Sequence, residues 1–267
     1  MKTILVHLDS GEGSAQRLQL AISLARSFDA TLTGLFAQID SDEAAITARR
    51  ASPQLRALAA QRQADFTSQT AAAGIKSEWL ELPHGEPGFV ISESVFCARY
   101  ADLAVIGQWD ADDGKVPEDF AERLVLDSGR PVLVIPHAGK MAAFGQKIGI
   151  AWNASREASR ALHDSLPFLA RAKEVTVLTI RPTESSTVIP GLPSLNVVKH
   201  LAQHGIAATG ERVVEEDIGL MDSLLLQSHN HGFDLLVMGA HSGLGVIRGS
   251  GTRFMLRHMT LPVLMSC

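Results

Sequence analysis

A glycine-rich segment near the end of the chain has residue types suited to binding an anion. Residues 239–252 read GAHSGLGVIRGSGT, and a helix is predicted over residues 251–258. Glycines let backbone N–H groups approach a ligand, and a helix N-terminus adds unpaired N–H donors and partial positive charge. Ser250 and Thr252 add hydroxyl groups. A flexible connector capped at Ser250 would have the same composition, so these residues alone leave phosphate binding and a connector both open.

Two common phosphate-binding motifs and an evident catalytic set are absent. The P-loop pattern GxxxxGK[ST] does not occur, and the dinucleotide-binding fingerprint would have to follow the first strand of its domain. Residues 9–14 (DSGEGS) resemble only loosely the SGGxDS loop of adenylate- and amide-forming enzymes, and no nucleophile has an adjacent base. The sequence therefore predicts no catalytic residues, while slow ATP hydrolysis stays open.

An internal repeat indicates which elements position the loop. Residues 102–107 (DLAVIG) are echoed by residues 234–239 (DLLVMG), and residues 129–135 (GRPVLVI) by residues 260–266 (TLPVLMS). The spacing from glycine to proline is 24 residues in the first copy and 23 in the second. Matched blocks at matched spacing, with a period near half the chain, predict a duplicated domain.

Each copy is predicted to alternate strands and helices. The central strands are almost wholly apolar, which is typical of parallel sheets covered on both faces. The sequence thus predicts an α/β fold of two tandem doubly wound parallel-sheet domains, residues 1–138 and 145–267, with a linker around 136–145. The expected strands are 3–8, 31–36, 76–82, 103–106 and 132–135, then 147–152, 175–180, 207–214, 235–238 and 263–265.

Helix boundaries are predicted from capping residues and proline. Ser10 and Ser155 are candidate N-caps for the first helix of each copy. Residues 41–73 form either one long helix or two helices broken near Pro53.

Composition limits the function classes. The net charge is −5, so general nucleic-acid binding is disfavoured. The two cysteines form no CxxC pair, and no metal site is predicted; His229 and His231 could clamp a metal or complement a helix C-terminus. No apolar run reaches the roughly 18 residues of a membrane helix, and the N-terminus has no signal-peptide core. We expect a cytoplasmic protein without a membrane span.

The C-terminal copy resembles a known family. Residues 238–239 (MG), 249–252 (GSGT), 256–258 (LRH) and 262–264 (PVL) resemble the C-terminal signature of universal stress proteins, and both copies share the skeleton. The resemblance is to the tandem, two-domain type, and it implies that the glycine loop holds the phosphates and ribose of ATP, or of AMP or ADP, with or without Mg²⁺. It also implies that the two repeats pair with each other, and the chain could further form a homodimer.

The resemblance implies a set of nucleotide-binding residues. Asn153 stands where the family has an aspartate on the adenine side, and Ile180 stands at the strand end that contacts the base. Ser242 replaces the second motif glycine, and the loop from there to Gly249 is three residues shorter than the family pattern. The predicted set is Ala151, Asn153, Ile180, Met238, Gly239, Ser242, Gly249, Ser250, Gly251 and Thr252.

The first copy departs further from the pattern. Counting back from Pro131 places Glu118 and Asp119 at the positions of Gly249 and Ser250. Carboxylates there would repel a phosphate, so we expect no nucleotide binding of the family type in this copy. Asp9 keeps the family's first-strand aspartate and is predicted to cap a helix.

Three functions compete. The first is an ATP-binding stress-response protein, with little or no catalysis, that uses its C-terminal repeat. The second is a scaffold, or a binder of another small ligand, with degenerate pockets, which the shortened loop and the altered first copy would explain. The third is an enzyme of a related ATP-using class, for which the sequence offers no catalytic set.

Overall fold

The structure is a computed structural model, and it describes residues 1–138, 143–181, 196–214, 219–240 and 250–267. The chain divides into two compact units, Met1–His137 and Ala138–Cys267. Each unit is an α/β domain with a parallel sheet, as the sequence predicted. None of the helices in the described ranges is both long and apolar enough to cross a membrane.

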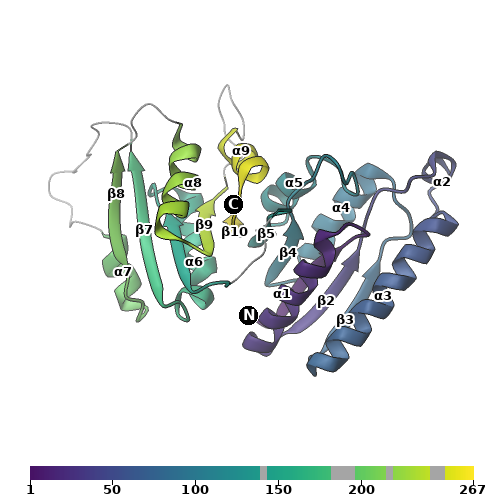
Figure 1. Ribbon diagram of the computed structural model, residues 1–267, viewed down its shortest axis with the longest axis horizontal. Coiled ribbons are helices and arrows are strands. Elements are labelled where there is room, and N and C mark those ends of the chain that lie inside the picture. Colours follow the sequence, from purple (N-terminus) through teal and green to yellow (C-terminus); the bar gives the residue numbers. More distant parts are fainter. Residues whose placement is uncertain (139–142, 182–195, 215–218, 241–249) are drawn as a thin grey trace. The chain divides into compact units, whose positions relative to one another are not determined.

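The N-terminal unit has a five-strand parallel sheet in the order β3-β2-β1-β4-β5. Helices α1 and α3 contact each other on one face, and α4 and α5 contact each other on the other face, as Figure 1 shows. The strands are β1 (Thr3–Leu8), β2 (Thr31–Phe36), β3 (Ser77–Glu81), β4 (Leu103–Gly107) and β5 (Val132–Ile135). The helices are α1 (Gly13–Phe28), α2 (Glu43–Thr47), α3 (Pro53–Ala73), α4 (Pro87–Ala98) and α5 (Phe120–Asp127).

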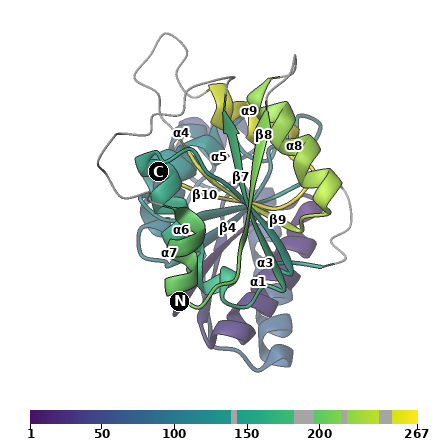
Figure 2. The same cartoon turned by 90° about the vertical axis from the view of Figure 1, so that its left-hand side faces the viewer.

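The C-terminal unit repeats this order as β8-β7-β6-β9-β10. Figure 2 shows its sheet from one end, with α6 and α7 on one side and α8 and α9 on the other. Its strands are β6 (Lys147–Ala151), β7 (Glu174–Arg181), β8 (Thr209–Val214), β9 (Leu235–Gly239) and β10 (Val263–Ser266). Its helices are α6 (Arg156–Leu169), α7 (Val197–Gln203), α8 (Leu220–His231) and α9 (Ser250–His258).

Strand register relates the two copies residue by residue. Ile4 of β1 pairs with Leu103, and Ile148 of β6 pairs with Leu235, so an offset of 144 residues connects the first strands. Under this offset Asp9 corresponds to Asn153, as the sequence comparison had it. The apolar strands β4, β5, β9 and β10 are almost entirely buried, as expected for strands covered on both faces.

The helix starts confirm one predicted cap and overturn two. Ser155 is the N-cap of α6, where its Oγ accepts a hydrogen bond from the Ala158 N–H at 3.1 Å. The prediction for Ser10 was wrong, because α1 begins at Gly13 after Glu12 and has no side-chain cap. Asp9 caps no helix either: its Oδ1 accepts from the Gly11 N–H at 2.9 Å, and its Oδ2 is held in an ion pair with Arg17.

The stretch 41–73 forms two helices, and the second begins at Pro53. Proline suits the first helical position because the missing N–H would have no partner there. Ser52 precedes it as N-cap, and its Oγ accepts from the Leu55 N–H at 3.0 Å. Ser52 is 3% exposed, and its own N–H donates to the Asp40 Oδ2 at 2.8 Å.

Ser52→Ala is expected to lower the free energy of unfolding of the N-terminal unit by about 1 kcal/mol, because the Leu55 N–H loses its acceptor. Urea denaturation measures the change. Ser68→Ala, at an exposed position inside the same helix, is the control and should leave stability unchanged or slightly raised, since alanine favours helices. Equal effects of the two substitutions would contradict the capping role.

Candidate functional site

In both units the strand order reverses between the first and fourth strands. These are β1 and β4 in the N-terminal unit and β6 and β9 in the C-terminal unit. In open parallel sheets such a switch point leaves a crevice at the carboxyl ends of the strands, where ligands bind. A cavity lies at this place in each unit.

The cavity of the C-terminal unit, here called the C-terminal recess, measures about 70 Å³ among the described residues. Four predicted binding residues line it, from the ends of two neighbouring strands: Ala151, Asn153, Met238 and Gly239. The remaining lining residues are mostly apolar: Trp152, Ser155, Leu178, Leu220, Met221 and Leu224. The recess therefore offers apolar contacts with few polar groups, a composition typical of small-molecule sites.

Asn153 is tied into the start of α6. Its Oδ1 accepts a hydrogen bond from the Ser155 N–H at 3.0 Å. The side-chain amide N–H groups remain as the donors that Asn153 can offer to a ligand. A ligand of the recess would thus meet a donor at the position where the family resemblance implies an acidic acceptor.

Gly239 is required by packing against α6. A Cβ at this position would lie 2.5 Å from both the Ala158 nitrogen and the Glu157 carbonyl carbon. Because these are backbone atoms, no side-chain rotation could relieve the clash. The glycine at the end of β9 therefore lets α6 approach the strand, whether or not a ligand also uses its backbone.

The remaining predicted binding residues are less fully described. Ser242 and Gly249 lie outside the described residues, Ile180 is described only as backbone of β7, and Ser250 only as the first residue of α9. Gly251 lies against Met221, since a Cβ there would be 3.3 Å from the methionine Cε. The first turn of α9 therefore lies next to a residue that lines the recess. Thr252 is buried.

The cavity of the N-terminal unit, here called the N-terminal pocket, is larger, at about 350 Å³. Its carboxylate-bearing lining residues are Asp9, Glu12, Asp110, Asp112 and Asp113, and its cationic lining residues are Arg17 and Lys115. Carboxylates thus outnumber cations around the pocket. Burial and the neighbouring charge of Asp9 raise the pKa of Asp113.

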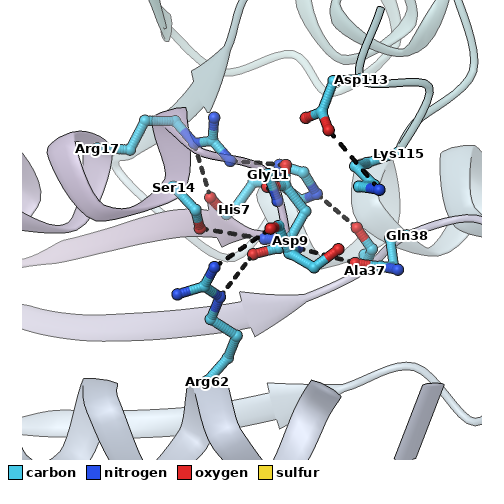
Figure 3. A network of polar contacts seen from close by, with 11 residues as sticks. His7, Asp9, Gly11, Ser14, Arg17, Ala37, Gln38, Arg62, Asp113 and Lys115 are labelled. Carbon is cyan, nitrogen blue, oxygen red and sulfur yellow. Dashed lines mark hydrogen bonds and ion pairs between the residues drawn. The ribbon is translucent and has the colours of Figure 1, made fainter. Parts of the chain in front are cut away.

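A buried ion pair lies at the base of this pocket. The Arg17 Nη2 is 2.7 Å from the Asp9 Oδ2, and Arg17 Nε donates to the His7 carbonyl at 3.2 Å (Figure 3). Arg17 is 6% exposed and Asp9 5%. Burial alone would raise the pKa of Asp9, but the charge of Arg17 and the hydrogen bonds from Arg17 and the Gly11 N–H hold it below its usual range.

Arg17 also occupies the space beside the end of β4. A Cβ at Gly107 would lie within 2.3 Å of the Arg17 Nη1. Gly107 corresponds to Gly239 of the other copy, where the neighbour is helix backbone instead of a guanidinium. The corresponding helix position in the C-terminal unit is Ala161, so the two copies fill the same place with different chemistry.

His7 is a neutral histidine inside the same network. Its Nε2 lies 2.6 Å from the Ala37 carbonyl, so that nitrogen carries the proton in the neutral ring. Its ring centroid is 4.7 Å from that of Phe120. Burial lowers the pKa of His7 to about 4, although the Asp9 carboxylate opposes this change.

The acidic pair predicted to block phosphate lies outside the lining of the N-terminal pocket. Asp119 is instead the N-cap residue of α5, and Phe120 begins that helix. A carboxylate there adds negative charge at the helix end that would otherwise attract an anion. Sequence reasoning missed the pairing of Asp9 with Arg17. The available signal was an arginine inside the otherwise apolar helix face of Leu18, Ala21 and Ala25.

As the side chains stand, no group of three or more His, Cys, Asp or Glu residues in the described ranges is arranged to hold a metal ion. Of the pair His229 and His231, the second has other partners: His231 Nε2 lies 3.0 Å from Glu211 Oε2, and its ring stacks on Phe233. His231 thus links the end of α8 to β8.

Comparison with known proteins identifies the fold. No family model and no curated protein sequence matches the chain. A universal stress protein from Archaeoglobus fulgidus DSM 4304 superposes with a TM-score of 0.75 at 17% identity, covering 99% of this chain and 97% of that one. The chain has the fold of the universal stress proteins. Because the match spans both units, this is the tandem form of the fold.

Two further solved structures show that proteins of different kinds share this fold. A putative universal stress protein from Pseudomonas aeruginosa UCBPP-PA14 matches with a TM-score of 0.65 at 17% identity, covering 100% of this chain and 93% of that one. The cytoplasmic domain of a prokaryotic cation chloride cotransporter matches with a TM-score of 0.55 at 10% identity, covering 99% and 94%. One fold thus serves different proteins, and the function has to be argued from the site.

Proposed function

We propose that this chain is a tandem universal stress protein of the cytoplasm that binds an adenine nucleotide through its C-terminal unit. The supporting observation is that Ala151, Asn153, Met238 and Gly239 line one apolar recess at the switch point. The first turn of α9 contacts Met221 of the same recess, so the N–H donors of a helix start lie close to it. The base would occupy the recess, and the phosphates would extend toward Ser250.

The N-terminal unit is assigned no nucleotide in this proposal. Its pocket is larger, but an ion pair fills its base and an excess of carboxylates surrounds it. The free energy of bringing a polyphosphate against these charges is unfavourable. One nucleotide per chain is therefore expected, as ATP, ADP or AMP, with or without Mg²⁺ and with at most slow hydrolysis.

Binding of ATP by the full-length protein, measured by isothermal titration calorimetry, tests the proposal. Gly249→Glu is expected to weaken binding at least about tenfold, because one unfavourable interaction of about 1.4 kcal/mol with the phosphates has that effect. Glu118→Gly, the reciprocal change in the N-terminal unit, is the matched control and should leave the affinity unchanged. Quenching of Trp152 fluorescence, absent in Trp152→Phe, would place the nucleotide at the recess.

Three outcomes would contradict the proposal. Equal weak heats for the wild type and Gly249→Glu would mean that the loop holds no phosphate. Loss of binding in the N-terminal control would place the nucleotide in the other unit. An unchanged melting temperature at saturating ATP would instead favour the scaffold hypothesis.

A further inference from the structure

Three histidine side chains from two helices gather in the C-terminal unit, and none of them lines the recess. His163 belongs to α6, His200 lies in α7, and His204 is the C-cap of α7. The ring centroids are 5.2 Å apart for His163 and His200, 6.0 Å for His163 and His204, and 4.9 Å for His200 and His204. Figure 2 shows that the two helices lie on the same side of the sheet.

The sequence spacing explains why two of the rings meet. Residues four apart on a helix project from the same face, one turn above each other. His200 and His204 therefore face the same neighbour, which is α6 with His163. The third ring comes from a different helix, so the spacing along the chain gives no sign of the cluster.

One nitrogen of the cluster lacks a partner. His200 Nε2 is buried and has no hydrogen-bond partner among the described residues. Buried polar atoms in native structures are nearly always satisfied, so such an atom indicates a missing ligand, water or ion. Imidazole nitrogens on three neighbouring rings are the ligands that Zn²⁺, Ni²⁺ and Cu²⁺ prefer.

The ring separations can be compared with those of a three-histidine metal centre. A Zn–N distance of about 2.0–2.1 Å places each ring centroid about 3.2 Å from the metal. At the tetrahedral angle two such centroids are then about 5.2 Å apart. The observed separations of 4.9, 5.2 and 6.0 Å lie around this value.

We propose that His163, His200 and His204 bind one divalent transition-metal ion, such as Zn²⁺, and thereby fasten α7 to α6. The three rings supply three ligands, and the fourth position is open to water, because His163 and His204 are exposed. In the described ranges no group of three such side chains is placed to hold a metal ion, so the histidine side chains must reorient when the ion binds. Coordination would satisfy the buried His200 Nε2.

The test is a titration of metal-free full-length protein with ZnCl₂, followed by calorimetry. One ion per chain is expected, and His163→Ala and His200→Ala should each weaken it at least about tenfold, since even indirect supporting groups contribute 10–100-fold to metal affinity. His163 is exposed on α6, so its replacement by alanine should leave the fold intact. A loss of Zn²⁺ binding in this variant would therefore not arise from misfolding. Zn²⁺ should raise the melting temperature of the wild type and not of these variants.

His229→Ala and His231→Ala are matched controls on α8 of the same unit and should keep the wild-type affinity. Loss of Zn²⁺ binding in these variants but not in His163→Ala would assign the ion to the other histidine pair and overturn the proposal. Absence of any saturable Zn²⁺ or Ni²⁺ binding would overturn it as well.

Discussion

Replacing Arg17 with methionine is expected to lower the free energy of unfolding of the N-terminal unit by about 3–5 kcal/mol, because Asp9 would remain buried without its counter-charge. Methionine retains much of the apolar stem of arginine, so most of the effect would be electrostatic. The Arg17 Nη2 lies 2.7 Å from the carboxylate, and both side chains are less than a tenth exposed. Hydrogen exchange of the β1 and β4 amides measures the loss in this unit alone.

An exposed ion pair in the same unit is the matched control. Arg123 Nε lies 2.8 Å from Asp127 Oδ2, but the two side chains are 55% and 39% exposed. Arg123→Met is therefore expected to cost no more than about 1 kcal/mol. Equal effects of the two substitutions would show that burial does not strengthen the Arg17 pair.

The C-terminal unit suggests a second substitution that would reduce the destabilisation expected for Arg17→Met. Its residues at the positions of Asp9 and Arg17 are Asn153 and Ala161, so this copy does without the pair. The double substitution Asp9→Asn and Arg17→Ala should accordingly be less destabilising than Arg17→Met. Removing both charges leaves no unpaired ion, which explains why buried pairs often contribute little net stability.

The sequence predicted the fold well because the fold depends on patterns that repeat. Apolar runs such as residues 103–106 and 235–238 are visible without any contact information, and both became central strands. The duplication supplied a second reading of each of the five strands. The boundaries of 31–36 and 132–135 were matched to the residue.

Helix starts were harder to predict because a cap depends on local backbone geometry. Ser10 lies two residues after β1 and Ser155 lies four residues after β6, and only Ser155 caps a helix. The Ser10 N–H instead donates to Gln38 Oε1 at 2.8 Å, and α1 begins three residues later. The cap position of α6 corresponds to Gly11 in the N-terminal unit, and glycine has no side chain that could accept a hydrogen bond there.

Part of the lining of the C-terminal recess could be predicted, while its use as a binding site stays a prediction. Strand ends were foreseeable, so Ala151, Asn153, Met238 and Gly239 were found where they meet. The larger N-terminal pocket was not foreseen, because its base depends on Arg17 turning inward from α1 to reach Asp9. A single arginine in a helix sequence does not show which way it points, and only its place among apolar residues hinted at burial.

The two copies thus share one fold but differ in the charged residues at the switch point. At the N-terminal switch point an internal ion pair fills the base of the pocket, and carboxylate side chains line its walls. The C-terminal switch point is lined mostly by apolar side chains. A duplicated domain permits this divergence, since one copy can keep a ligand site while the other becomes internally satisfied. The buried polar network then makes the stability of the N-terminal unit dependent on pH.

Acidification from about pH 6.5 to about pH 4 is expected to cost the N-terminal unit about 3 kcal/mol through His7 alone. Burial lowers the pKa of His7 to about 4 from its ordinary value of 6.5, so between these values the unfolded chain takes up a proton that the folded unit does not. The free energy of unfolding of this unit therefore decreases as the pH is lowered from about 6.5 to about 4. The contribution of Asp9 is lost only at lower pH, because its folded pKa is depressed below the ordinary carboxylate value.

His7→Gln should flatten this part of the pH profile, because glutamine can still donate to the Ala37 carbonyl but cannot be protonated. Hydrogen exchange of the β1 amides across the window measures the difference, and His137→Gln, at an exposed position, is the control. An unchanged pH slope in His7→Gln would mean that His7 is protonated inside the folded unit. The pocket would then hold an imidazolium beside Asp9, and its charge would be less negative than the carboxylates around it suggest.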